Sequence, residues 1–279
     1  DVNATYGSFT DPTSLGSGAG SLDEGGGAII IYATGTVNIN GLLSADGADD
    51  EHAWSGAGGS INISAATLTG AGVIRADGGD TNDSTDGSSG GGRISINGVT
   101  DADGFSGEIH ARGGILQRGG FAGTVYLNSA LRTNLVLGGT GMTTLRIGSD
   151  DSNDYTFTNI TIMSGGTLEI DGNPNRNNSS GGTATLNITN LVVQTGGTLS
   201  AKELGFRDSR GPGAGSTTDG ASHGGRGGDR VGVGIIPKST YGSITNPIFL
   251  GSGGGNKGYL SHGGGAIIVI ASGLVHVDG

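Results

Sequence analysis

The sequence contains no cysteine, so no disulfide can form, and cysteine usage gives no indication of the compartment in which the protein works. Aromatic residues are scarce, at 5% of the chain, and hydrophobic residues amount to 33%. This is too little apolar material for a thick globular core, but it is enough for a thin column of Ile, Val and Leu inside a narrow tube. No apolar run approaches the roughly 20 residues of a membrane-spanning helix, so we expect no membrane span.

Basic residues are also few. Lys and Arg number 14 against 25 Asp and Glu, and the formal net charge is −11. A nucleic-acid-binding surface needs clustered basic residues, so we expect no nucleic-acid partner; the charge suits a soluble exterior or divalent cations. The first residue is Asp1 rather than Met, which indicates a processed or excised piece.

Glycine is the abundant residue. It supplies 62 of the 279 residues, about three times the roughly 7% of an average protein. The absence of a strict G-X-Y period excludes collagen. We therefore expect the glycines at turns and where two backbone segments approach closely.

One pattern recurs along the first half of the chain. A glycine cluster leads into a short β-branched run, a polar break, a second short run and an Ala-Asp-Gly or Ala-Arg-Gly corner, in residues 25–47, 59–79 and 92–114. The three corners are Ala45-Asp46-Gly47, Ala76-Asp77-Gly78 and Ala111-Arg112-Gly113. The unit recurs about every thirty residues, which is the range of solenoid repeats.

Alternation of apolar and polar residues is nearly the whole secondary-structure signal. It predicts half-buried strands at residues 29–32, 37–39, 61–63, 73–74, 94–96, 108–110, 125–127, 145–147, 155–162, 167–170, 184–188, 191–193 and 198–201. No window keeps a helical period for ten residues, and the β-branched, Gly-rich composition disfavours helix. We therefore predict an all-β fold, a parallel β-helix (β-solenoid) with glycine-rich loops.

The domain organisation follows from the same pattern. A solenoid of this length needs no internal boundary because each coil contacts only its neighbours, so we expect residues 1–279 to form a single β-solenoid. Its parts are longer-looped glycine-rich coils at 1–137, tighter coils at 138–206, a glycine-rich excursion at 207–262, and at 263–279 a restart of the repeat seen at 25–41. The excursion is either mobile or packed in extended, polyglycine-like form.

The chain also repeats itself over a long distance. Residues 6–18 return at 241–253, an offset of 241 − 6 = 235, and after a loop three residues longer GGGAIII at 25–31 returns as GGGAIIV at 263–269. The open strand edges at the ends of a solenoid must be capped or paired. We predict copies of the same unit as partners, joined as tandem repeats or by end-to-end stacking of separate chains. The predicted assembly residues are Ala28, Ile29, Ile30, Ile31, Ala266, Ile267, Ile268 and Val269.

Acidic loops are the candidate metal sites, because hard oxygen ligands at close spacing can hold Ca²⁺. The predicted ligands are Asp77, Asp80, Asn82, Asp83 and Asp86. None of the acidic loops matches the EF-hand loop or the calcium-binding nonapeptide. The alternative is that these are solvated turn residues, favoured for their ability to form Asx turns. Calcium is the only cofactor that the sequence suggests.

No catalytic site is predicted. The sequence holds no HExxH, paired Cys, GxSxG or phosphate-cradling glycine motif. Adjacent carboxylates at Asp49-Asp50 and Asp150-Asp151 could serve a carbohydrate-cleaving β-helix, but only Trp54 lies near the first pair to stack a sugar. A glycan-binding or glycan-cleaving β-helix protein is therefore the alternative function.

The succession of a GGGAI-type strand, an Ala-Asp-Gly corner and the strand Gly90-Gly91-Gly92-Arg93-Ile94 resembles the glycine-rich repeats of very large bacterial cell-surface proteins of the adhesin or autotransporter-passenger kind. The resemblance covers most of the chain. It implies a right-handed parallel β-helix, export, and a role in adhesion or in an extracellular fibre or sheath, and it carries no catalytic residues. We therefore expect an extracellular or cell-surface structural protein, not an enzyme, with glycans or the cell surface as further candidate partners.

Overall fold

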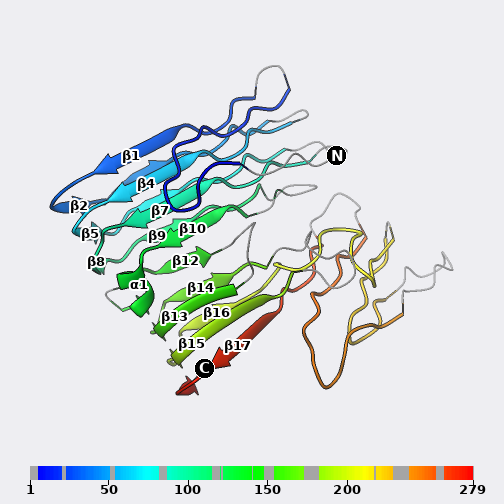
Figure 1. The fold of residues 1–279 in the computed structure, drawn as a ribbon. Helices are drawn as coiled ribbons and strands as arrows, with labels where there is room; N and C mark the ends of the chain where they lie inside the picture. Colours follow the sequence, from blue (N-terminus) through cyan, green and yellow to red (C-terminus); the bar gives the residue numbers. More distant parts are fainter. Residues whose placement is uncertain are drawn as a thin grey trace.

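The computed structural model describes residues 6–20, 23–50, 54–81, 87–114, 120, 122–139, 141–147, 154–172, 182–216, 218–228, 239–255 and 261–278. Its named strands all pair in parallel, in four sheets (Figure 1). The predicted all-β class with parallel sheets is therefore confirmed.

Each sheet is assembled from strands that lie one pass of the chain apart, and we call one such pass a coil. The first sheet contains β1 (Ala28–Tyr32), β4 (Ser60–Ser64), β7 (Arg93–Asn97) and β10 (Thr124–Leu127). The second contains β2 (Thr36–Asn38), β5 (Thr67–Gly70) and β8 (Asp101–Phe105). The third contains β3 (Leu42–Ser44), β6 (Val73–Arg75), β9 (Glu108–His110), β12 (Thr144–Ile147), β14 (Thr167–Ile170) and β16 (Thr198–Ser200). The fourth contains β11 (Asn134–Leu137), β13 (Asp154–Ile162), β15 (Ala184–Val193) and β17 (Ile267–Ala271), with β18 (Val275–Val277) also paired to β15.

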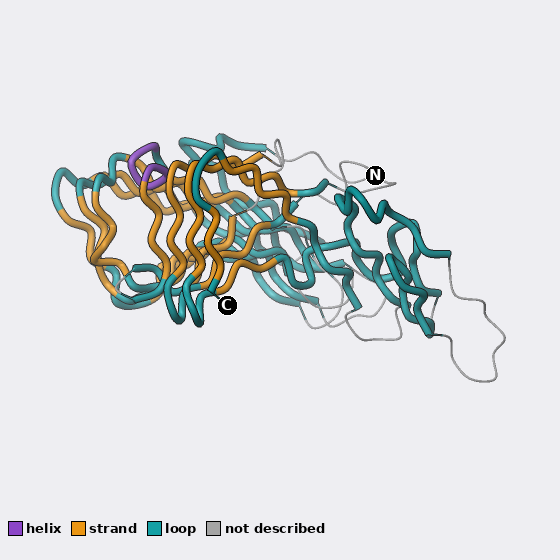
Figure 2. Tube along the Cα trace, turned by 90° about the horizontal axis from the view of Figure 1, so that it is seen from below, coloured by secondary structure: helices purple, strands orange, loops and turns teal. Residues whose placement is uncertain are grey.

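Register between coils keeps like residues in contact. In the third sheet one aliphatic side chain from every strand falls in a single column, formed by Leu43, Ile74, Ile109, Leu145, Leu168 and Leu199. The four inner members are buried, and the two outer members are only partly buried. The core is therefore a stack of aliphatic columns running from coil to coil, and Figure 2 shows the strands of successive coils lying over one another.

Glycine allows the coils to approach one another just before the strands of the first sheet. A Cβ atom added to Gly92 would lie 2.0 Å from the carbonyl oxygen of Gly59, the residue one coil earlier. Real side chains cannot occupy that space, so the backbone spacing itself requires glycine there.

One short helix is found among the described residues, α1 (Ser129–Thr133), and it joins β10 to β11. The side chain of Asn128 caps it by accepting a hydrogen bond from the N–H of Leu131 at 3.1 Å, and Leu131 is buried. The sequence did not predict this helix, because five residues are too few to show a helical period. No helix among the described residues has the length and apolar character needed to cross a bilayer.

The N-terminal segment, residues 6–18, is irregular and lies across the outer face of the first sheet (dark blue in Figure 1). The glycine-rich segments near the C-terminus are also irregular, but they are joined backbone to backbone. Gly205 N–H donates to Gly263, Phe206 N–H to Gly251, and Gly251 N–H to Gly264, each at 2.8–2.9 Å. Gly251, in the excursion, is thus bonded through its backbone to segments on either side of the excursion in the sequence.

Candidate functional site

The two ends of the sheet stack are the first candidate site. β1 is the outermost strand of the first sheet and β17 that of the fourth, and they lie at opposite ends of the structure (Figure 1). Each therefore presents one unpaired edge within the described part of the chain. An exposed strand edge is a template for pairing with another strand.

The aliphatic columns stop abruptly at the end formed by β17 and β18. Leu191 is 2% exposed, but Val275, its partner in the next coil, is 50% exposed. Val193 and Val277 show the same contrast, at 5% and 63%. The last layer of the core therefore faces solvent, as an inner layer would if the coil beyond it were removed.

The predicted assembly residues all lie in or beside the two edge strands, and their side chains point in two directions. Ile29, Ile31 and Ile267 pack against the core from partly buried positions. Ile30 is 44% exposed and Val269 36% exposed. The structure thus groups these residues within each end, and it does not bring the two ends together.

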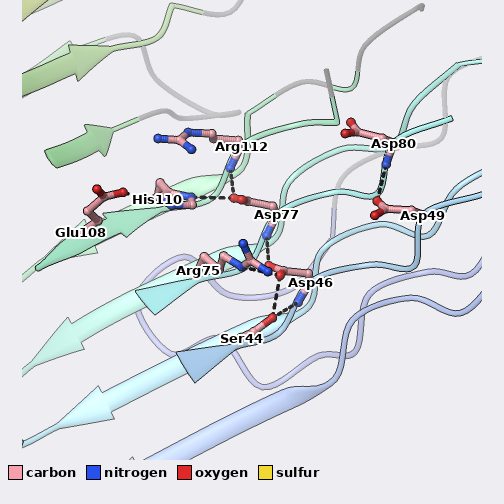
Figure 3. A network of polar contacts seen from close by, with 9 residues as sticks. All are labelled: Ser44, Asp46, Asp49, Arg75, Asp77, Asp80, Glu108, His110 and Arg112. Carbon is pink, nitrogen blue, oxygen red and sulfur yellow. Dashed lines mark hydrogen bonds and ion pairs between the residues drawn. The ribbon is translucent and has the colours of Figure 1, made fainter. Parts of the chain in front are cut away.

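The corner residues form a second candidate site, shown in Figure 3. Oδ1 of Asp46 accepts a hydrogen bond from the N–H of Asp77 at 2.8 Å, and Oδ1 of Asp77 accepts one from the N–H of Arg112 at 2.6 Å. Each carboxylate therefore binds the backbone of the equivalent corner in the next coil. Two side chains add further contacts: Arg75 Nε forms an ion pair with Asp46 Oδ2 at 2.6 Å, and His110 Nδ1 lies within hydrogen-bond distance of Asp77 Oδ1, at 2.9 Å.

The neighbouring loop repeats this arrangement nearer to solvent. Oδ1 of Asp49 accepts a hydrogen bond from the N–H of Asp80 at 2.8 Å (Figure 3). The N–H of Asp50 in turn donates to the carbonyl oxygen of Asp80 at 2.9 Å. Acidic residues thus connect one coil to the next, a structural role that the alternative interpretation as solvated turn residues did not include.

Of the predicted calcium ligands, Asp77 and Asp80 are described, and Asn82, Asp83 and Asp86 lie outside the described residues. No group of three or more His, Cys, Asp or Glu in the described residues is arranged to hold a metal ion. The Asp77 carboxylate is already bonded to Arg112 and His110. Calcium in this loop stays a prediction.

A buried ionic cluster, which the sequence did not predict, lies where the excursion meets the sheets. Arg146 Nη2 is 2.9 Å from Asp171 Oδ2, and the hydroxyl of Tyr155 donates to the Asp171 carbonyl at 2.7 Å. Burial raises the pKa of Asp171, and the charge of Arg146 opposes that shift. Arg207 donates to the carbonyl oxygen of Gly120, and burial lowers its pKa to about 10.

His262 and Asp208 extend this cluster into the excursion. Oδ1 of Asp208 accepts hydrogen bonds from the N–H and the hydroxyl of Ser261, at 2.7 and 3.0 Å, and lies 3.9 Å from His262 Nε2. Burial lowers the pKa of His262, with the Arg207 charge acting in the same direction and Asp208 against it. The cluster connects the excursion to the sheets. Its members are far apart in sequence, so only the folded register could have revealed it.

The residues considered for glycan binding are only partly brought together. Trp54 is 51% exposed, and its backbone N–H donates to Oδ2 of Asp50 at 3.2 Å. Asp150 and Asp151 lie outside the described residues. The glycan-binding alternative stays a prediction. No protein-family model, curated protein or solved structure matches this chain.

Proposed function

We propose that this chain is a unit of an extracellular structural or adhesive rod, fibre or sheath. In this proposal the coils form a parallel β-solenoid, and the solenoid continues from one unit to the next by end-to-end stacking or tandem repetition. The chain has no catalytic role in it. The extracellular setting is supported by the resemblance of the repeats to bacterial surface proteins.

One observation carries the proposal: the aliphatic core is uncovered at β17 and β18. Val275 and Val277 continue columns whose inner members are buried, yet they are at least half exposed. Fully burying an exposed side chain of this kind is favourable by roughly 1.5–3 kcal/mol. A further coil that covers these side chains gains part of that free energy as well as ladder hydrogen bonds. A contact between unlike ends that does not close into a ring propagates a filament.

Electron microscopy of the purified chain tests the proposal. We expect rods longer than one unit, and we expect Val275→Lys with Val277→Lys to shorten them, because charge at an edge strand blocks pairing. Thr156→Lys is the matched control, since Thr156 is exposed on β13, away from either end. Deletion of residues 266–279 should abolish assembly. Compact particles from the unmodified chain, or filaments unchanged by the deletion, would count against the proposal.

A further inference from the structure

The two long-range copies in the sequence fold into the same hydrogen-bonded motif. The hydroxyl of Tyr6 donates to the carbonyl oxygen of Leu15 at 2.5 Å, and Tyr241 donates to Leu250 at the same distance. The remaining equivalent bonds are Ser17 to Tyr6 (3.0 Å) and Ser252 to Tyr241 (2.8 Å), Asp11 N–H to Ser8 and Asn246 N–H to Ser243 (3.0 Å each), and Gly16 N–H to Gly26 and Gly251 N–H to Gly264 (2.8 Å each). The second copy therefore folds into the same motif as the first.

The two copies are buried on opposite sides. Leu15 is 65% exposed, whereas its equivalent Leu250 is fully buried. Conversely Pro12 is buried and its equivalent Pro247 is exposed. The side of the motif that carries Leu15 or Leu250 is thus covered by other residues only in the second copy. The side that carries Pro12 or Pro247 is covered only in the first copy.

Ile244 marks the uncovered side of the second copy. It is 101% exposed, whereas its equivalent Phe9 is 36% exposed and packs edge-on against Tyr126 with ring centroids 5.2 Å apart. An aliphatic residue this exposed in a folded motif lacks the apolar surface that its equivalent contacts.

Glycine contacts divide in the same way. A Cβ atom at Gly26 would lie 2.0 Å from the carbonyl oxygen of Ala45 in the same coil, but one at the equivalent Gly264 would meet nothing within 4 Å. In the other direction, a Cβ atom at Gly273 would lie 2.6 Å from Asn190 Oδ1, and one at the equivalent Gly35 would meet nothing. The first copy is therefore contacted by residues that come later in the sequence, and the second copy is contacted by residues that come earlier.

Besides Tyr126 of β10, the first copy covers polar residues of β4 and β7. Asn62 and Ser95 are buried there, and they donate to Oδ1 of Asp11 at 2.5 Å and to the carbonyl oxygen of Thr10 at 2.8 Å. The equivalent acceptors in the second copy are Asn246 Oδ1 and the Thr245 carbonyl oxygen. These two atoms accept no hydrogen bond from any described residue.

From these paired differences we propose that residues 241–255 and 261–278 begin a second unit, equivalent to residues 6–20 and 23–40 of the first, and that they receive a further copy of the coils of residues 42–127 in the same chain. The inference rests on the proposed function and specifies the junction between one unit and the next. Strands β17 and β18 take the places of β1 and β2, because residues 263–279 correspond to 25–41 at an offset of 263 − 25 = 238. A β3-like strand then follows, to pair with the open edge of β16 and continue its column from Leu199.

A two-unit chain tests the junction without a linker: residues 1–279 are followed directly by residues 42–279 of a second copy. The protein has no cysteine, so Ile244→Cys in the first unit gives a single thiol whose alkylation rate reports exposure. We expect labelling at least about tenfold slower than in the single unit, because a covered side chain reacts only through local opening. Thr156→Cys should react equally in both chains.

The matched control joins residue 279 to residue 1 of the second copy. That copy brings its own residues 6–41 to the same place, so the thiol of Ile244→Cys in this chain should label as fast as in the single unit. Equal labelling in all three chains, protection in both two-unit chains, or a second copy from residue 42 that fails to fold would each overturn the inference. Rods formed by the single-unit chain are scored separately by microscopy, so the proposed function can stand while this junction fails.

Discussion

His110 and Asp77, 33 residues apart, meet across one coil boundary, with Nδ1 of His110 2.9 Å from Oδ1 of Asp77. The same oxygen accepts the N–H of Arg112. His110 is 3% exposed, so the carboxylate serves a buried ring and a backbone donor together. The corner is therefore a place where one side chain connects two coils.

Asp77→Ala should lower the free energy of unfolding by about 2 kcal/mol, because hydrogen bonds to charged groups are worth roughly 1.5–3 kcal/mol. Denaturant unfolding measures this. Asp49→Ala is the control, since among the described residues the exposed Asp49 carboxylate bonds one N–H, that of Asp80, and its loss should cost under about 1 kcal/mol. Equal effects of the two substitutions would argue against a special role for the corner.

Position along an aliphatic column should set the cost of truncation. Leu145→Ala removes a fully buried side chain from the middle of the third sheet and should cost about 2–5 kcal/mol. Leu199→Ala is the same change at the open end, where the side chain is only partly buried, and should cost about half as much or less. Comparable losses in thermal or denaturant unfolding would mean that the end of the column is covered.

The sequence predicted the strands well where alternation was strong. Residues 155–162 alternate apolar and polar side chains over most of their length and lie in the long strand β13. The strands predicted at 184–188 and 191–193 are joined in one strand, β15 (Ala184–Val193). The strands β3, β5, β8 and β11 were not predicted. The sequence of β8, DADGF, has little alternation, and the strand is held in place by pairing with β5. Pairing between coils overrides local propensity there.

The candidate sites were predicted less completely. The internal copy of residues 6–18 was visible as a sequence match, but its opposite exposure at Leu15 and Leu250 depends on which neighbours surround each copy. The ionic cluster of Arg146, Asp171 and Arg207 has no local signature, because its members come from different coils. Predicting such a site requires the exact register between coils, and the spacing of the sequence repeats gives that register only approximately.

Acid should destabilise the excursion through His262. Burial and the Arg207 charge lower its pKa in the folded state, and Arg146 acts in the same direction, against the opposing charges of Asp208 and Glu203. As the pH falls, His262 therefore takes up a proton in the unfolded state at a higher pH than in the folded state. The contribution of His262 to stability is complete above the ordinary His pKa of about 6.5 and is lost as the pH falls through the pKa of the folded state.

We expect the free energy of unfolding to fall less steeply between pH 7 and pH 5 in His262→Gln than in the unmodified protein. His276→Gln, which alters a half-exposed histidine in β18, is the matched control and should leave the slope unchanged. Parallel curves for His262→Gln and the unmodified protein would rule out His262 as the source.

Chelation tests the calcium prediction directly. If the loop that follows Asp77 and Asp80 binds Ca²⁺, EDTA should lower the melting temperature and added calcium should restore it, because a ligand that binds only the folded state stabilises it. Magnesium is the control ion, since it prefers a stricter octahedral site. Identical melts with and without chelator would remove the metal from this loop.

Alkaline pH should distinguish the two copies of the tyrosine motif. Burial raises the pKa of Tyr241, with the hydrogen bond from Ser252 acting against that shift. The folded state therefore keeps the neutral phenol while the unfolded state ionises, and stability is lost as the pH rises above the ordinary value of about 10.

Tyr241→Phe should cost about 1 kcal/mol at pH 7 through its lost hydrogen bonds, yet it should flatten the decline above pH 10. Tyr6→Phe removes the same bonds from a half-exposed ring and should leave the alkaline decline in place. A decline that is equally steep in both variants would show that neither tyrosine controls it.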